Sequence, residues 1–164
     1  KRGARIYCEI SGYANTCDAY HMTAPHPEAF GCIKMIELLL QEYGKKIDKK
    51  TYINMHGTST PMNDRVETYA VKKVLSDLAY EIPVSSTKSV TGHMLGAAGA
   101  MEAIFAIKSL NEGIIPPTIG YREKDEECDL DYVPNEARKY DIDVAMSFSL
   151  GFGGHNGGIL FNRV

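Results

Sequence analysis

The chain has 164 residues, enough for one domain with a sizeable buried core. Its net charge of -3 gives no reason to expect binding to nucleic acid or to an anionic membrane. No apolar run approaches the roughly 18 residues of a membrane span, and the basic start at residues 1–5 is not followed by the apolar region of a signal peptide.

The chain alternates between strand-like and helix-like segments. In order, we expect a strand at 6–13, a loop at 15–27, a helix at 28–43, a strand at 52–55, a helix at 61–78, a strand at 82–85, a helix at 95–111, a loop at 115–130 and strands at 143–148 and 158–162. Alternation early and two strands at the end predict an α/β protein with a mixed sheet, which has a largely parallel part and an antiparallel terminal pair.

Proline and glycine mark several of these boundaries. Pro27 suits the first turn of the helix at 28–43, and Gly44 is a natural stop. Gly96 and Gly99 each cost the helix at 95–111 about 1 kcal/mol relative to alanine. Their usual compensation is close approach of another backbone, so we expect this helix to be buried centrally and to end at Gly113. The acidic segment at 115–130 predicts a solvated surface loop.

The four cysteines show no spacing typical of a zinc site or a disulfide framework. We therefore expect free thiols in a cytoplasmic protein. The cysteines are Cys8, Cys17, Cys32 and Cys128.

Two histidines and a lysine each follow an apolar, strand-like run: His56, Lys88 and His93. In α/β proteins ligands bind beyond the carboxyl ends of the strands, so we expect the three side chains to converge. Together they can polarise a carbonyl or stabilise an anion, although no obvious nucleophile accompanies them. A single histidine of this kind is more often structural, and a single lysine more often lies on the surface, so the case depends on the combination of the three.

The helix that follows His93 has a partial positive charge at its start, which disfavours an imidazolium. We expect a neutral ring that donates a hydrogen bond to an oxyanion. The glycine loop at 151–157 either brings backbone amides to the same place or forms a tight hairpin turn.

Short polar side chains surround His56. The hydroxyls of Thr58, Ser59 and Thr60 can bond the amides of an extended ligand or cap the next helix. Asp64 and Glu67 are either partners of Lys88 or exposed carboxylates on a helix surface.

The order and spacing of these motifs resemble the C-terminal half of the β-ketoacyl-[acyl-carrier-protein] synthases, specifically the type II elongating enzymes of bacterial fatty acid synthesis. The resemblance covers nearly all 164 residues. Its motifs are Asp18–Thr23, His56–Pro61, Ser85–His93, Gly96–Gly99, Pro116–Thr118 and Gly151–Gly154.

The resemblance implies the thiolase fold, a five-layer α-β-α-β-α sandwich of two similar halves, each with a five-stranded mixed sheet. Residues 1–164 resemble the second half, so we expect a piece of a longer protein whose N-terminal half carries a nucleophilic cysteine. None of the four cysteines here has a nucleophile-elbow context. This chain alone is therefore expected to be inactive.

The implied reaction is a decarboxylative Claisen condensation of an acyl thioester with malonyl-acyl carrier protein. The implied partners are the acyl carrier protein, the chain's own N-terminal half and a second copy in a homodimer. No cofactor is required, because the substrates ride on the carrier protein's phosphopantetheine. In some members the positions of Asn54, Glu102 and Asn156 surround a structural monovalent cation.

Site residues follow from the same resemblance. His56 and His93 match the two active-site histidines that stabilise the enolate. Lys88 matches the active-site lysine, whose charge biases the nearby histidine toward its neutral form. Glu67 matches the carboxylate linked to that lysine, and Asp64 supports it.

The resemblance also assigns the substrate channel. Thr58 and Thr60 match hydroxyls that bond the phosphopantetheine arm, and Thr23 contributes. Phe152 matches a gating phenylalanine whose backbone N–H is half of the oxyanion hole, flanked by Gly151 and Gly153.

Two departures leave gating and chain-length preference open: Leu150 replaces an aromatic residue and His155 replaces a threonine. A ketosynthase of a polyketide pathway remains an alternative, because it shares the histidines and the lysine. A non-catalytic chain-length-factor-like partner is a second, although such proteins typically lose these residues. A thiolase would carry a cysteine in the loop at 151–157, and initiating type III synthases carry asparagine in place of His93.

Overall fold

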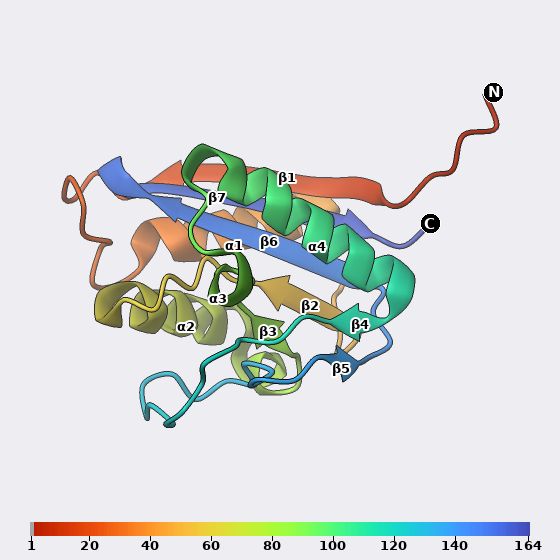
Figure 1. Ribbon diagram of the computed structural model, residues 1–164. Coiled ribbons are helices and arrows are strands. Elements are labelled where there is room, and N and C mark those ends of the chain that lie inside the picture. The colour runs from red at the N-terminus through yellow and green to blue at the C-terminus, as the bar shows by residue number, and fades with distance from the viewer. Residues whose placement is uncertain (1) are drawn as a thin grey trace.

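A five-stranded mixed sheet in the order β1-β7-β6-β2-β3 organises the computed structural model, which describes residues 2–164 (Figure 1). Its strands are β1 (Glu9–Cys17), β2 (Thr51–Asn54), β3 (Val84–Ser85), β6 (Val144–Gly151) and β7 (His155–Asn162). A second sheet pairs β4 (Ile114–Ile115) with β5 (Arg138–Lys139). The helices are α1 (Phe30–Tyr43), α2 (Pro61–Leu75), α3 (Lys88–Thr91) and α4 (Ala98–Glu112), with 3-10 turns at Ser76–Tyr80, Leu95–Ala97 and Phe152–Gly154.

The sheet has a parallel part and an antiparallel part. β2 is parallel to both β3 and β6, whereas β7 is antiparallel to β6 and β1. The predicted mixed sheet with an antiparallel terminal pair is confirmed. The first strand of the chain thereby pairs with the last, from Glu9 opposite Asn162 to Cys17 opposite His155.

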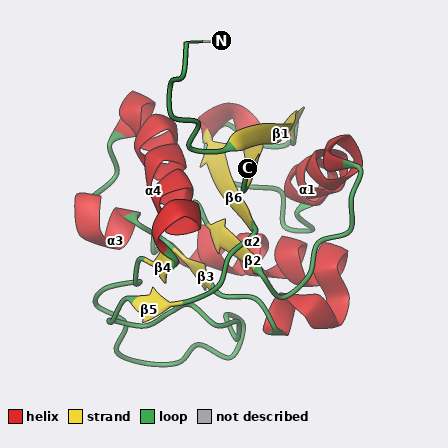
Figure 2. Cartoon of the chain, turned by 90° about the vertical axis from the view of Figure 1, so that its right-hand side faces the viewer, coloured by secondary structure: helices red, strands yellow, loops and turns green. Residues whose placement is uncertain are grey.

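Helices cover both faces of the sheet, with α4 on one side and α1 and α2 on the other (Figure 2). On the α1 face, Met35 and Leu39 pack so tightly on Gly158 that a Cβ there would lie 2.3 Å from the Met35 sulfur. On the other face, Leu110 packs with Phe161. Among the described residues, no helix is long and apolar enough to cross a bilayer.

Several boundaries differ from the sequence prediction, among them the following three. The first strand runs from Glu9 to Cys17 rather than over 6–13, because β7 offers it a pairing partner through Cys17. The helix predicted from Glu28 starts at Phe30, so Pro27 is not in its first turn. The helix predicted to reach Leu78 ends at Leu75, and a 3-10 turn follows it.

The glycine stops are confirmed: Gly44 and Gly113 adopt left-handed conformations with φ of 66° and 64° and donate to carbonyls of the preceding turns. The expected central burial of the glycine-alanine segment is wrong for this chain. Gly96 and Gly99 are exposed, and apart from the adjoining residues no atom of residues 2–164 lies within 4 Å of a Cβ built on Gly96. α4 itself begins only at Ala98.

The acidic segment after β4 is exposed from 122 to 127, as expected for a surface loop. Its carboxylates pair with basic side chains of α2: Glu127 and Asp125 with Arg65, and Asp129 with Lys72.

Candidate active site

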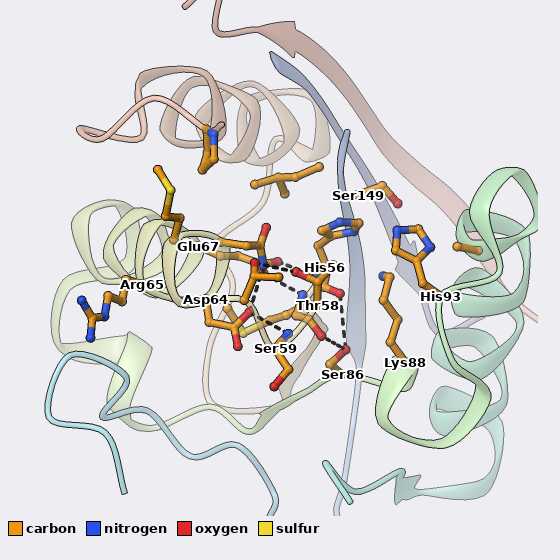
Figure 3. Close-up of a pocket in the computed structure, with 18 of the residues that line it drawn as sticks. His56, Thr58, Ser59, Asp64, Arg65, Glu67, Ser86, Lys88, His93 and Ser149 are labelled. Atoms are coloured by element: carbon orange, nitrogen blue, oxygen red, sulfur yellow. Dashed lines mark hydrogen bonds between the residues drawn. The ribbon is translucent and has the colours of Figure 1, made fainter. Parts of the chain in front are cut away.

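The predicted residues converge on one large open cavity of about 1890 Å³ (Figure 3). His56 lies just past the end of β2, Lys88 follows β3, and the glycine turn at 152–154 follows β6. The carboxyl ends of these three parallel strands meet at one edge of the sheet, which brings the loops together. His93 reaches the same cavity from the segment before α4.

The two histidine rings face each other edge to face. Their centroids are 5.4 Å apart, with an interplanar angle of 82° (Figure 3). His93 Nδ1 accepts the Leu95 N–H at 3.1 Å. A neutral His93 ring therefore carries its proton on Nε2, which makes that atom a hydrogen-bond donor.

His56 is held as a neutral imidazole. Its pKa falls from its usual value of 6.5 to about 3, first because the ring is buried and second because of the positive charge of Lys88, with His93 contributing less. At neutral pH the ring therefore offers a single N–H. Nδ1 is buried and has no partner among the described residues.

The partner of Lys88 is not the one predicted from the sequence. The Lys88 ammonium forms an ion pair with Glu102 of α4, not with Glu67 or Asp64 of α2. The prediction was wrong because Glu67 is already engaged elsewhere. The signal for Glu102 was present: a lone carboxylate in an apolar helical stretch needs a partner when it is buried.

Glu67 instead fixes the backbone that presents His56. Its fully buried carboxylate accepts the N–H groups of His56 at 2.6 Å and Gly57 at 2.9 Å, and the Asn63 amide at 3.3 Å. Burial raises the pKa of Glu67 to about 7, although these backbone bonds oppose the shift. Asp64 likewise accepts the Ser59 N–H at 3.2 Å, so it is neither a lysine partner nor a free surface group.

The turn after His56 requires a glycine. Gly57 has a φ of 42°, and a Cβ there would lie 2.5 Å from the Cβ of Ser86. The Ser86 hydroxyl donates to the Gly57 carbonyl at 2.8 Å. Ser86 thus joins the loop after β3 to the loop after β2, a role the sequence did not reveal.

The predicted hydroxyls line the cavity. Thr58 and Thr60 contact each other through their Oγ1 atoms at 3.0 Å, and Thr23 lines the cavity from the loop after β1. Capping of α2 by these side chains is not observed: Thr60 is the N-cap residue, but its side chain makes no capping bond. Only its carbonyl accepts the Asp64 N–H, at 3.1 Å.

The glycine turn forms the hairpin between β6 and β7, and residues of the same segment line the cavity. The two interpretations of this loop, a tight hairpin and an approach to the site, are therefore compatible. Phe152 is 77% exposed at its start. Gly153, at φ 82°, donates its N–H to the Met22 carbonyl at 2.7 Å, which removes that N–H as an oxyanion donor. Gly151 lines the cavity beside Phe152.

The three residues expected around a cation do not surround one point. The Asn54 amide contacts the Glu102 carbonyl at 3.4 Å on the α4 face of the sheet. Asn156 lies on the α1 face, where it donates to Asp18 at 2.9 Å and a Cβ on Gly31 would meet it at 2.4 Å. The predicted grouping is therefore wrong. Within residues 2–164, no three His, Cys, Asp or Glu side chains lie in position for a metal ion.

Three of the cysteines lie in surroundings that disfavour a nucleophilic thiolate. Burial raises the pKa of the thiols of Cys8, Cys32 and Cys128. Cys32 is buried in the core and is raised furthest, with Glu67 and Asp18 adding to the effect. A raised pKa suppresses the thiolate that a nucleophile needs.

Comparison with known proteins agrees with this architecture. Residues 7–122 match the family described as beta-ketoacyl synthase, C-terminal domain. The chain is 52% identical over 162 residues to a 3-oxoacyl-[acyl-carrier-protein] synthase 2 of Synechocystis, covering 99% of this chain and 39% of that protein. It is 51% identical over 164 residues to the synthase 2 of Coxiella burnetii, covering 100% and 40%.

Solved structures share the fold. A chain from the complex of a type II PKS acyl-carrier protein with its ketosynthase bound to the hexaketide superposes with a TM-score of 0.95 at 39% identity, over 99% of this chain and 40% of that one. A beta-ketoacyl synthase from Burkholderia phymatum gives 0.89 at 37% identity, over 99% and 39%. The predicted thiolase-like fold class is thereby confirmed. The chain spans about two fifths of the length of the curated relatives it matches, and it belongs to the β-ketoacyl synthase family through the C-terminal domain of that family.

Proposed function

We propose that this chain supplies the decarboxylation site of a 3-oxoacyl-[acyl-carrier-protein] synthase of fatty acid elongation, whose N-terminal half supplies the nucleophilic cysteine. The observation that carries the proposal is the pair of imidazoles 5.4 Å apart, with a buried ammonium nearby. Relatives that are 49–52% identical bear the name 3-oxoacyl-[acyl-carrier-protein] synthase 2.

The proposed step begins with a malonyl thioester whose carbonyl oxygen lies between the two rings. The bond to the carboxylate carbon breaks, carbon dioxide leaves, and the electron pair forms an enolate with its charge on the thioester oxygen. An N–H of the neutral His56 and the Nε2–H of His93 stabilise that charge. The enolate carbon then attacks the acyl thioester on the cysteine of the N-terminal half, which releases the cysteine thiolate.

Lys88 contributes a fixed charge rather than a proton. Its ammonium is paired with Glu102 and buried, so its position is set by the fold. The positive charge helps to keep His56 neutral and favours negative charge in the cavity. Glu67 holds the His56 backbone in place, and Asp64 supports the next turn.

The phosphopantetheine arm of the substrate lies along the threonine hydroxyls of the cavity. We place the phosphopantetheine amides against Thr58, Thr60 and Thr23, which line one continuous cavity with His56. The Phe152 backbone N–H serves the acyl carbonyl in the second half-reaction. The carrier is an acyl carrier protein, and one structural neighbour is a ketosynthase complex with such a protein. The chemistry needs no cofactor, because N–H groups stabilise the enolate.

The exposed apolar side chains on the α4 side of the sheet suit an internal interface. They include Ile10 and Tyr13 of β1, Leu95, and Ile104 of α4. We propose that the N-terminal half covers this face, and that the whole enzyme is a cytoplasmic homodimer.

A polyketide ketosynthase is the second candidate, because the 39% identical neighbour comes from a complex in which a ketosynthase is bound to a hexaketide. The higher identity to synthases named for 3-oxoacyl products favours fatty acid elongation. A chain-length-factor role is disfavoured, because His56, Lys88 and His93 are present and placed together.

Intact mass spectrometry after incubation with an acyl-loaded carrier protein tests the division of labour. We expect an acyl adduct on the complete synthase and none on residues 1–164 alone. An adduct on any of the four cysteines of this chain would place the nucleophile here and reopen the thiolase alternative.

A further inference from the structure

The turn that contains Phe152 forms backbone hydrogen bonds with the loop after β1. Gly153 donates its N–H to the Met22 carbonyl at 2.7 Å, and the Gly154 carbonyl accepts the Asp18 N–H at 2.8 Å. Both bonds cross from the hairpin β6–β7 to the loop after β1. The backbone of the turn is therefore tied to a neighbour far away in sequence.

The imidazole of His155 covers the same glycine. A Cβ on Gly153 would lie 3.3 Å from His155 Cδ2 and 3.4 Å from Nε2, so the ring lies against the Gly153 Cα. His155 is also the residue that closes the hairpin opposite Gly151. The side chain is exposed and is not needed to fill the core.

Cys17 holds the other side of the peptide. Its thiol lies 3.4 Å from the Gly153 carbonyl as a donor, and Cys17 is the direct cross-strand neighbour of His155 on β1. The Gly153 peptide is thus restrained at its N–H, its carbonyl and its Cα.

We propose that His155 is a positioning residue for Phe152: its ring on Gly153, with the Cys17 thiol on the carbonyl, holds the turn in place at the rim of the cavity. Gly153 and Gly154 both have positive φ, 82° and 78°. As glycines they have no side chain that could restrain the turn. The restraint comes from the neighbours. The consequence for substrate entry rests on the proposed function, whereas the positioning role does not.

Amide hydrogen exchange of the segment 151–155 tests the positioning role in the complete protein. We expect His155→Ala to accelerate exchange of the Gly153 amide about tenfold or more, because its bond to Met22 opens more often. His155→Phe, which keeps an aromatic ring on Gly153, is the matched control and should exchange like the unmodified protein. Equal exchange in His155→Ala and the unmodified protein would overturn the proposal.

The same comparison at Cys17 separates the thiol's bond from its bulk. Cys17→Ser keeps a donor and should leave exchange within twofold, whereas Cys17→Ala should accelerate it. Both variants concern an exposed side chain, so folding is not at risk.

The consequence for entry is measured as the rate of acyl transfer to the complete enzyme before steady state. We expect His155→Ala to change this rate severalfold and His155→Phe to preserve it. An unchanged rate beside faster exchange would overturn the link to substrate entry. An unmodified protein that takes up no acyl group, but shows the expected exchange pattern, would count against the proposed function and leave the positioning role standing.

Discussion

The Lys88 ammonium and the Glu102 carboxylate form an ion pair in which the two side chains are only 5% and 4% exposed. A charge taken out of water at such a depth is tolerated because its partner is in contact. The second Glu102 oxygen is buried without a hydrogen-bond partner among the described residues. The pair therefore holds a positive charge near His56. Burial costs both charged groups their hydration, and their mutual attraction offsets that cost only while both are present.

Removal of one partner should reveal that cost. We expect Glu102→Gln to lower the free energy of unfolding by about 3–5 kcal/mol, because it leaves Lys88 buried and unpaired. Glu112→Gln is the matched control: its pair with Lys108 lies on the same helix and is exposed, and should be worth less than about 1 kcal/mol. Chemical denaturation of the complete protein measures both. Equal losses in the two variants would contradict the burial argument.

Each of the two histidines should be required for decarboxylation, even when the other is present. We expect His56→Ala and His93→Ala each to slow carbon dioxide release from malonyl-carrier protein by about 10²–10³-fold, the usual effect of losing one oxyanion donor. Circular dichroism checks that the variants remain folded. Carbon dioxide release at the original rate in both variants would end the proposed mechanism.

Stability should depend on pH through His56. Its pKa in the folded state is about 3, below the unfolded value of 6.5, so the unfolded chain binds more protons between these values. The contribution of His56 is therefore fully present above pH 6.5 and is lost as the pH falls toward 3. We expect the free energy of unfolding to fall by up to about 1.4 kcal/mol per pH unit relative to a His56→Asn variant.

Glu67 changes the pH dependence of stability in the opposite direction to His56. Its folded pKa of about 7 lies above its ordinary value of 4.5, so its contribution is present below pH 4.5 and is lost as the pH rises through 7. The two groups oppose each other between pH 4.5 and 6.5. Urea midpoints of His56→Asn and Glu67→Gln across this range separate them, and parallel curves for both variants and the unmodified protein would refute the assignment.

The glycine after His56 should resist substitution more than a glycine elsewhere. Gly57→Ala forces a Cβ to within 2.5 Å of Ser86 Cβ, so we expect a loss of roughly 3 kcal/mol of stability and a displaced His56. Gly120→Ala is the control: its φ is also positive, at 83°, but a Cβ there has no described atom within 4 Å apart from its chain neighbours, so only about 1 kcal/mol should be lost. Thermal unfolding and carbon dioxide release together show whether the crowding at Ser86 matters.

Sequence periodicity and glycine positions predicted the sheet, the main helices and the convergence of His56, Lys88 and His93. These predictions succeeded because they depend on local patterns and on a general rule for parallel strands. Boundaries failed where tertiary pairing decided them, as at Cys17, where β7 extends the first strand.

The partners of the charged groups could not be predicted in the same way. Lys88 pairs with a residue 14 positions away on another helix, and Glu67 accepts backbone N–H groups rather than a lysine. Such choices depend on which side chain occupies a particular buried volume, which no spacing rule describes. The separation of Asn156 from Glu102 has a similar origin. Successive side chains of a strand point to opposite faces of the sheet, and Asn156 of β7 points to the α1 face, away from Glu102 on α4.

The pairing of β1 with β7 has a consequence for the synthesis of this protein. The partner of Glu9–Cys17 is β7, His155–Asn162, so this part of the sheet cannot form until the residues up to Asn162 have left the ribosome. Thr23 and the glycine turn are brought together by the same closure, which makes the cavity one of the last features to form. Contacts between such distant segments slow folding, and until they form, β7 does not cover the apolar face of α1 that carries Met35 and Leu39.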